Sequence, residues 1–93
     1  MKFVHHREFL NEDDTVVIHC SKTCNIRLMN DRNFRSYKNG GRHTYYGGAF
    51  EDFPARIKVP STANWNITID TMNHKGISTE FTHKLKIIRN KSK

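Results

Sequence analysis

The chain of 93 residues predicts an all-β fold, a compact single-domain antiparallel β-sandwich of jelly-roll or Greek-key type with seven or eight strands. The first observation is a pair of runs, 55–59 and 64–70, in which apolar and polar residues alternate strictly. The second is that shorter alternating runs recur along the chain with no internal repeat and no linker. Side chains in a strand point alternately to two faces, so each run describes a strand with one face in a core.

The two strongest strands predict which residues build that core. Pro54 and Pro60 bracket the first strand, where a missing N–H does least harm to a ladder. Each strand is expected to be half-buried, with polar residues on its outer face. The expected inward residues are Ala55, Ile57, Val59, Trp65, Ile67 and Ile69, and the expected outward residues are Arg56, Lys58, Asn64, Asn66, Thr68 and Asp70.

The N-terminal third predicts three further strands. Residues 2–10 form an opening strand, and the polar residues 11–14 form a turn suited to local side-chain hydrogen bonds. Residues 15–20 and 24–30 alternate again, with Arg27 outward in the second run. The three residues between these runs are short enough for a hairpin, so we expect the two strands to pair with each other.

The middle and the C-terminal third are less regular. Residues 31–41 lose the alternation and allow one helical turn, since Phe34 and Tyr37 are three apart. Residues 42–46 are expected as a short strand, after which Gly47 and Gly48 free the backbone for a turn or a close approach. We expect a turn at 71–76, one long last strand from Ile77 to Ile87, and a frayed basic tail at 89–93 of the single domain 1–93.

The net charge of +7 is concentrated in two stretches. Residues 21–46 carry six bases against one acid, Asp31, and residues 84–93 carry five bases and no acid. Basic stretches attract phosphates, acidic proteins or anionic surfaces, and charge alone does not choose among these partners. No apolar run approaches the roughly 20 residues of a membrane helix, and the charged N-terminus lacks a secretory signal, so a cytoplasmic location is expected.

The basic stretch from Arg32 to Tyr46 is the first candidate binding site, because cations and aromatic rings alternate in it. Cations would meet an anion, and rings would stack on a base or a sugar. The alternative is that the rings cap the core and the cations are only solvated. The ligand-binding hypothesis names seven residues: Arg35, Tyr37, Lys38, Arg42, His43, Tyr45 and Tyr46.

Catalytic and metal-binding templates are missing from the sequence. There is no nucleophile elbow, zincin helix or phosphate-binding loop, so we expect no enzymatic activity and no cofactor. Cys20 and Cys24 lack the second ligand pair of a zinc site, and we interpret them as small buried residues. His83 falls on the apolar face of the last strand and is interpreted as a core histidine.

Three blocks of the sequence resemble a known family. They are Cys24–Met29, then Asn33–Lys38 with Gly41–Gly48, and finally Pro54–Pro60 with Trp65–Asp70. These blocks resemble a small bacterial domain of unknown function, family 1883, found alone or fused to TIR domains. The resemblance spans nearly the whole chain and implies a β-sandwich, without implying an activity or catalytic residues. It also implies a TIR-domain partner and a context of signalling or phage defence.

The sequence therefore predicts a non-catalytic recognition module that binds an anionic, nucleotide-like ligand or an acidic partner surface. One alternative is a protein–protein or self-association domain that pairs through an edge strand. Another is a glycan-binding sandwich, which requires Trp65 or Tyr46 at the surface. Nucleic acid is a further candidate partner because of the basic tail. A membrane partner is not expected. The sequence does not indicate an oligomeric state.

Overall fold

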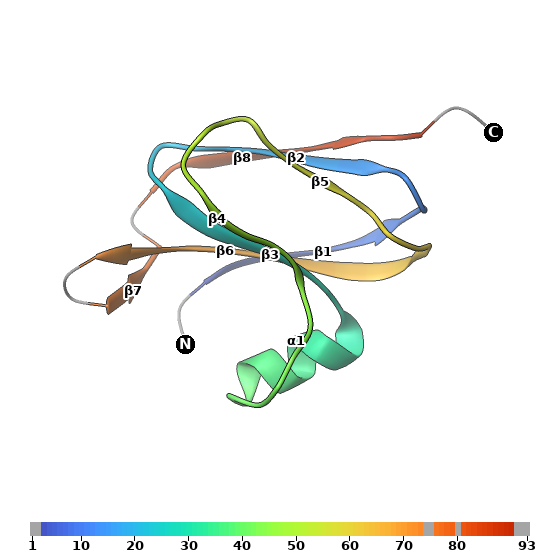
Figure 1. The fold of residues 1–93 in the computed structure, drawn as a ribbon, viewed down its shortest axis with the longest axis horizontal. Coiled ribbons are helices and arrows are strands. Elements are labelled where there is room, and N and C mark those ends of the chain that lie inside the picture. Colours follow the sequence, from blue (N-terminus) through green and yellow to red (C-terminus); the bar gives the residue numbers. More distant parts are fainter. Residues whose placement is uncertain (1–2, 74–75, 80, 91–93) are drawn as a thin grey trace.

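The computed structural model describes residues 3–73, 76–79 and 81–90, and confirms the all-β sandwich. All strand pairs are antiparallel, and a single helix interrupts the strands in the described part of the chain (Figure 1). In chain order the elements are β1 (Val4–Leu10), β2 (Thr15–Cys20), β3 (Cys24–Asn30), α1 (Asp31–Lys38), β4 (Tyr46–Phe50), β5 (Ala55–Lys58), β6 (Ala63–Asn73), β7 (Gly76–Ser78) and β8 (His83–Ile88).

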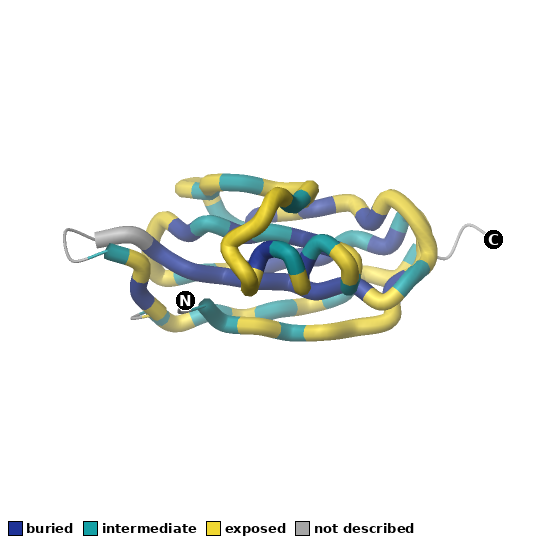
Figure 2. The backbone as a smooth tube through the Cα atoms, turned by 90° about the horizontal axis from the view of Figure 1, so that it is seen from below, coloured by how far each residue is buried: buried dark blue, intermediate teal, exposed yellow. Residues whose placement is uncertain are grey.

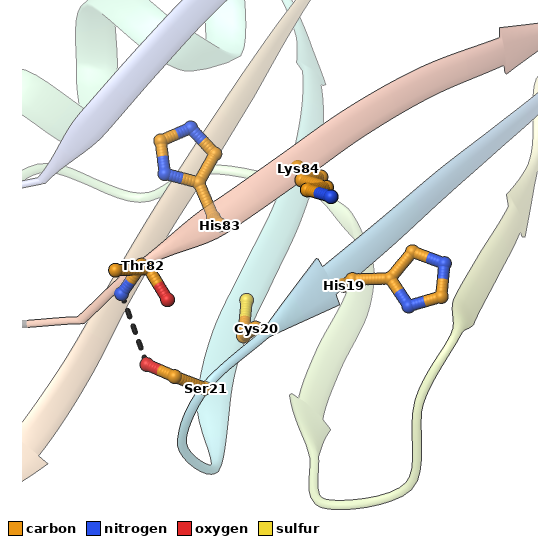
Figure 3. A pocket seen from close by; sticks show the side chains of 6 residues that line it. All are labelled: His19, Cys20, Ser21, Thr82, His83 and Lys84. Atoms are coloured by element: carbon orange, nitrogen blue, oxygen red, sulfur yellow. Dashed lines mark hydrogen bonds between the residues drawn. The ribbon is translucent and has the colours of Figure 1, made fainter.

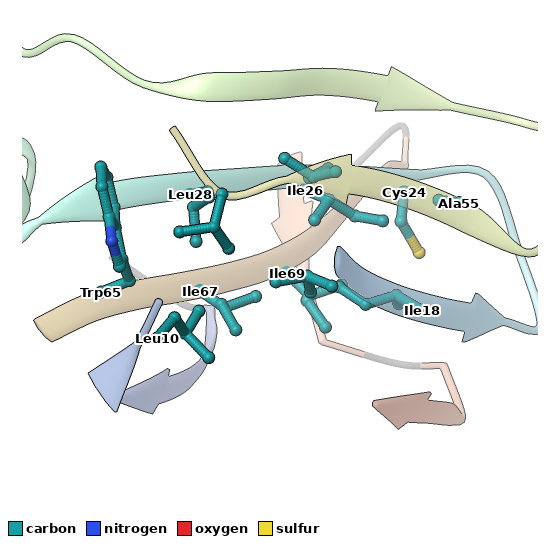
Figure 4. Close-up of a cluster of buried hydrophobic side chains, with 12 residues drawn as sticks. Leu10, Ile18, Cys24, Ile26, Leu28, Ala55, Trp65, Ile67 and Ile69 are labelled. Atoms are coloured by element: carbon teal, nitrogen blue, oxygen red, sulfur yellow. The ribbon is translucent and has the colours of Figure 1, made fainter. Parts of the chain in front are cut away.

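Two sheets face each other across the core. The larger sheet has the order β1-β6-β3-β4, with β7 added to the end of β6, and the smaller sheet has the order β5-β2-β8. Their inward side chains alternate as the sequence predicts, and they interdigitate in one apolar cluster (Figure 4). Trp65 is 4% exposed within it. The cluster contains Leu10, Val16, Ile18, Cys24, Ile26, Leu28, Ala55, Ile57, Val59, Trp65, Ile67 and Ile69.

Strand β6 differs from prediction because both of its faces are covered. The expected outer residues Asn66, Thr68 and Asp70 are each at most 1% exposed, so burial is continuous from Trp65 to Thr71 (Figure 2). The cover is α1, which packs on the outer side of β3 and β6, on the far side of the larger sheet from β5, β2 and β8 (Figure 1). Polar residues on a strand are thus not evidence of exposure when a helix lies over them.

Helix α1 is longer than the single turn that the sequence allowed. Asn30 caps its N-terminus, since the Asn30 side-chain oxygen accepts a hydrogen bond from the backbone N–H of Asn33. Phe34 and Tyr37 turn toward the sheet, and Phe34 stacks on His5 with ring centroids 4.1 Å apart. The helix therefore has a cap and a buried aromatic face, which together offset its short length.

An ion pair fastens the start of α1 to the sheet. Arg7 donates two hydrogen bonds to Asp31, at 3.0 and 2.7 Å, and the amide of Asn66 donates a third at 2.8 Å. The Arg7 hydrogen bond, helped by that from Asn66, lowers the pKa of the Asp31 carboxyl to about 2. Asp31 is consequently ionised at neutral pH, and its charge favours the helix N-terminus.

The expected hairpin between β2 and β3 is wrong. These strands follow each other with only Ser21, Lys22 and Thr23 between them, yet β2 belongs to the smaller sheet and β3 to the larger one. The connection is therefore a corner that crosses the sandwich. Strand β2 pairs instead with β5 and β8, which supply apolar partners on the same inner face.

Two other boundaries also differ from prediction. The strand expected at 42–46 begins only at Tyr46 and runs through Gly47 and Gly48, where β4 pairs with β3. The expected long last strand is two strands in different sheets, β7 and β8, and in β7 Ser78 is buried while Ile77 is exposed. The turn expected at 71–76 lies partly outside the described residues, and β6 continues to Asn73.

The tail expected to fray from Arg89 onward is held through its first two residues. The Arg89 guanidinium donates to Asp14 at 3.0 Å and to the carbonyl of Phe9 at 3.3 Å. The backbone N–H of Asn90 also donates to Asp14 at 2.8 Å. Asp14 in turn accepts from the backbone N–H of Asn11, so the predicted polar turn is joined to the end of β8. Residues 91–93 lie outside the described residues.

Candidate anion-binding face

The predicted basic and aromatic segment contributes three of its seven residues to one cluster. The ring of His43 contacts those of Tyr37 and Tyr45, with centroids 4.9 and 5.7 Å away. The Arg27 guanidinium completes the cluster, 5.4 Å from the Tyr37 centroid and 5.3 Å from the Tyr45 centroid, within the range of cation–π contacts. We call Arg27, Tyr37, His43 and Tyr45 the aromatic cluster. Its rings already contact each other and Arg27, edge to face for Tyr37 and His43 and tilted for His43 and Tyr45.

Asp70 binds the Arg27 guanidinium of the aromatic cluster and is itself bound by Asn25. Asp70 is 1% exposed and accepts hydrogen bonds from the Asn25 amide at 2.9 Å and from Arg27 at 3.2 Å. Burial raises the pKa of the Tyr37 hydroxyl, against the opposing effect of Arg27, so Tyr37 stays neutral at physiological pH. Sequence reasoning did not anticipate this polar layer, because alternation placed Asp70 at the surface.

The other four predicted residues lie around the aromatic cluster without joining it. Arg35, Lys38 and Arg42 are exposed, and the Lys38 ammonium lies 4.8 Å from the Phe34 ring. Tyr46 is 46% exposed and meets the edge of the buried Trp65. The structure thus brings Tyr37, His43 and Tyr45 together, and the contacts of the cluster do not include Arg35, Lys38, Arg42 or Tyr46.

A second cationic surface, not among the predicted sites, lies on the outer side of the smaller sheet. Four exposed cations alternate there with buried or half-buried neighbours: Arg56, Lys58, Lys84 and Lys86. We call these four residues, with the exposed His19, the basic face. Strands β5, β2 and β8 contain no aspartate or glutamate, so no carboxylate within the sheet neutralises it.

The sheet register arranges these cations in rows. Arg56 and Lys86 flank Val17 in one row, and Lys84 lies opposite His19 in the next. With strands about 4.8 Å apart, the Cα atoms of Arg56 and Lys86 are about 10 Å apart. Val17 is only 4% exposed, which indicates that the aliphatic stems on either side cover it.

Few carboxylates offset the basic face from outside the sheet. Lys58 contacts Asp13 at 3.7 Å, and both side chains are well exposed, so the pair is weak. In the part of the chain that the structure describes, no ion pair joins Arg56, Lys84 or Lys86 to a carboxylate. The face therefore presents a local positive field that is open to solvent.

A hollow of about 400 Å³ opens where β2 ends and β8 begins (Figure 3). Ser21 follows β2 and Thr82 precedes β8 at one border of the hollow, where the Thr82 backbone N–H donates to the Ser21 hydroxyl oxygen at 2.9 Å. Two residues of the basic face also line it, so cationic and hydroxyl groups surround one space. The lining residues are His19, Cys20, Ser21, Thr82, His83 and Lys84.

His83 and His6 join the two sheets beside this hollow. Their Nε2 atoms lie 3.2 Å apart with ring centroids at 5.5 Å, which is the head-on geometry of a hydrogen bond between two imidazoles. Burial lowers the pKa of His6, and the nearby His83 lowers it further, whereas Glu8 opposes the shift. His83 thus has a hydrogen-bond partner.

The cysteines are neutral thiols. Cys24 is buried and Cys20 is half-buried, and both are free. Burial raises the pKa of both thiols, that of Cys24 to about 12, so both are protonated and weakly nucleophilic at neutral pH. Among residues 3–73, 76–79 and 81–90, no three histidine, cysteine, aspartate or glutamate side chains gather as metal ligands. In the same described residues, no helix is long and apolar enough to cross a membrane, since α1 has only eight residues.

One signal in the sequence could have indicated the basic face. Arg56 with Lys58 and Lys84 with Lys86 are two pairs of cations at period-two spacing, which puts each pair on the outer face of a strand. What the sequence does not show is that β2 lies between these strands and brings both pairs to one surface.

Comparison with known families supports the resemblance described for the sequence. Comparison with curated proteins and with solved structures finds no match. The family model described as a domain of unknown function (DUF1883) matches residues 1–90, nearly the whole chain. The chain belongs to this family of domains of unknown function.

Proposed function

We propose that this domain is a non-catalytic recognition module that binds an anionic partner through the basic face. The observation that carries the proposal is the charge of the smaller sheet, where four outward cations face solvent and no strand contributes a carboxylate. Association with an anion releases counterions and exploits the local field, without requiring a deep pocket.

The basic face is a better candidate than the segment predicted from sequence, for reasons of packing. Stacking on a ligand needs free aromatic faces, but Arg27 and His43 already contact the Tyr45 ring. Arg35 and Lys38 are exposed cations of α1, close in sequence to the ionised Asp31. The predicted residues thus remain a second candidate surface for the same anionic partner, and an experiment must separate the two.

Paired neutralising variants make that separation. A fluorescently labelled DNA duplex serves as a generic polyanion, and fluorescence anisotropy measures its affinity at several salt concentrations. For about four phosphate contacts, the slope of log K against log salt is about −3.6. The variant Arg56→Gln with Lys86→Gln removes two of the contacts and should reduce the slope by about 1.8.

The matched control is Arg35→Gln with Lys38→Gln, which removes the same charge from α1. It should leave the slope close to that of the unaltered protein. Equal loss in both double variants would mean that only net charge attracts the duplex, and a larger loss in the control would move the site to the predicted segment. All four positions are exposed, so unfolding free energies should stay within about 0.5 kcal/mol.

We also propose a TIR-domain protein in the cytoplasm as the biological partner, in signalling or phage defence. The support is the resemblance of the sequence to a family found fused to TIR domains. Co-expression with a TIR-domain protein and affinity purification tests this. Failure to co-purify at low salt, where charge attraction is strongest, would count against it.

Self-association through an edge strand is a second candidate function. Strand β4 is an edge of the larger sheet, and it is uncharged and partly exposed along its length. Such an edge is a template for another strand. The glycan alternative requires Trp65 or Tyr46 at the surface; Tyr46 is exposed and Trp65 is buried, so one exposed ring would carry the binding. Sedimentation of a monomer at every concentration would refute self-association.

A further inference from the structure

The hollow between the ends of β2 and β8 has a lining that suits a particular anion. Lys84 brings an ammonium group with three N–H donors, and His19 lies opposite Lys84 in the register of the two strands. Ser21 and Thr82 add hydroxyl groups at the turn, and none of the lining residues is a carboxylate (Figure 3). Lysine ammonium groups and hydroxyls are common partners of phosphate oxygens.

The hydroxyl of Ser21 is oriented by a hydrogen bond from Thr82, the residue before β8. Its oxygen accepts the Thr82 backbone N–H at 2.9 Å, and the Ser21 backbone N–H donates to the Thr82 carbonyl at 3.0 Å. A serine hydroxyl that already accepts a hydrogen bond keeps its own proton free to donate. Ser21 therefore presents a donor from a position that two backbone hydrogen bonds define.

The remaining lining residues add no negative charge. Burial raises the pKa of the Cys20 thiol, so Cys20 stays neutral at physiological pH. His83 directs its Nε2 atom to His6 at 3.2 Å, which leaves the exposed His19 and Lys84 as the lining residues with available nitrogen atoms. Lys86 and Arg56, farther along the sheet, extend the positive field beyond the hollow.

The size of the hollow limits the ligand. A volume of about 400 Å³ lies at the lower end of the range of small-molecule sites, which is about 300 to 1,000 Å³. This volume accommodates a phosphate group with a small organic part. Building on the proposed function, we propose that this hollow binds the phosphate group of a small phosphorylated molecule, with Lys84, His19, Ser21 and Thr82 as the contacting residues.

Backbone amide NMR tests the site directly, because it locates weak binding. The protein is titrated with inorganic phosphate and with adenosine monophosphate, and adenosine serves as the ligand without phosphate. The proposal expects saturating shifts centred on Ser21, Thr82 and Lys84 with both phosphates and none with adenosine. Shifts spread evenly over all exposed cations would overturn it, since they would report only general charge attraction.

Two single variants make the test quantitative. Lys84→Gln should weaken phosphate binding by at least about tenfold, as expected for loss of a charged hydrogen bond. Arg32→Gln removes the same charge from helix α1, away from the hollow, and should change the affinity less than about twofold, since only long-range attraction is lost. Equal losses in the two variants would overturn the site. Both side chains are exposed, so both variants should keep the fold.

The outcome is independent of the test of the proposed function, which uses Arg56 and Lys86. Duplex binding that depends on those two residues, without phosphate binding that depends on Lys84, would refute the hollow and leave the basic face intact. Phosphate binding that depends on Lys84, without duplex binding, would confirm the hollow and refute the basic face as an extended binding surface.

Discussion

Gly47 in strand β4 is the position where a single methyl group should distort the sandwich most. Its φ is +117°, in the region that favours glycine, and a Cβ atom added there would collide with the Ile26 carbonyl oxygen. The same Cβ would lie 3.1 Å from Cδ1 of Ile57 in the opposite sheet. Because the first obstacle is backbone, β4 would have to move away from β3.

Gly48 provides the matched control in the same strand. Its φ is +144°, so alanine would be strained there as well, but a Cβ would meet no atom within 4 Å. The strain of an unfavourable backbone region is about 1–3 kcal/mol and applies to both positions. Overpacking adds about 1–3 kcal/mol and applies only at Gly47. We therefore expect Gly47→Ala to lower the unfolding free energy by about 1–3 kcal/mol more than Gly48→Ala does.

Urea unfolding followed by fluorescence measures this difference. Trp65 is the single tryptophan and is 4% exposed, so its emission should report loss of the core. The two variants are compared through their transition midpoints at a common slope. If Gly47→Ala and Gly48→Ala are equally stable within about 0.5 kcal/mol, the close approach of β4 to β3 does not constrain the sandwich, and the reasoning fails.

Two further predictions concern the histidine pair and the helix cap. Since the pKa of His6 is lowered in the folded state by burial and by His83, the unfolded chain binds more protons below about pH 6.5. The contribution of His6 to the unfolding free energy should thus be fully present above that pH and be lost as the pH drops through the lowered pKa. His6→Gln should reduce this pH dependence of the thermal midpoint. An unchanged profile of thermal midpoints against pH would refute the role of the pair. Asn30→Ala removes the cap on the Asn33 N–H and should lower the free energy of unfolding, measured in urea, by about 1 kcal/mol. The control is Asn39→Ala, at a C-cap that is formed through the backbone, and it should lower that free energy by less than about 0.5 kcal/mol. Equal costs would contradict the capping role.

Local alternation predicted the core well because it depends on neighbours only two residues apart. Ile57 and Ile67 lie on the faces expected, since each strand buries one side whatever its partner. The same rule failed for Thr68 and Asp70, where α1 covers the outer face. A helix that packs on polar strand residues through ion pairs and aromatic rings leaves no apolar pattern in the strand itself.

Pairing partners were harder to predict, because a short loop does not specify them. The three residues from Ser21 to Thr23 would suit a hairpin, but they form a corner between sheets. The choice depends on β5 and β8, which come more than 30 residues later and offer β2 a continuous inner face. Likewise, apolar residues continue past residue 80 without marking the change of sheet between β7 and β8.

The location of the positive charge shows the same dependence on distant pairing. Counted along the chain, Arg56 and Lys58 are inconspicuous, because residues 47–83 hold more acids than bases. Counted by face, they join Lys84 and Lys86 on a sheet whose strands carry no acid, because β2 lies between the two edge strands. In the stretch with the most bases, Arg27 is bound to Asp70 and its guanidinium lies against two tyrosine rings. The charge that is free to attract an anion is therefore set by which strands pair, and the smaller sheet is where binding should be sought first.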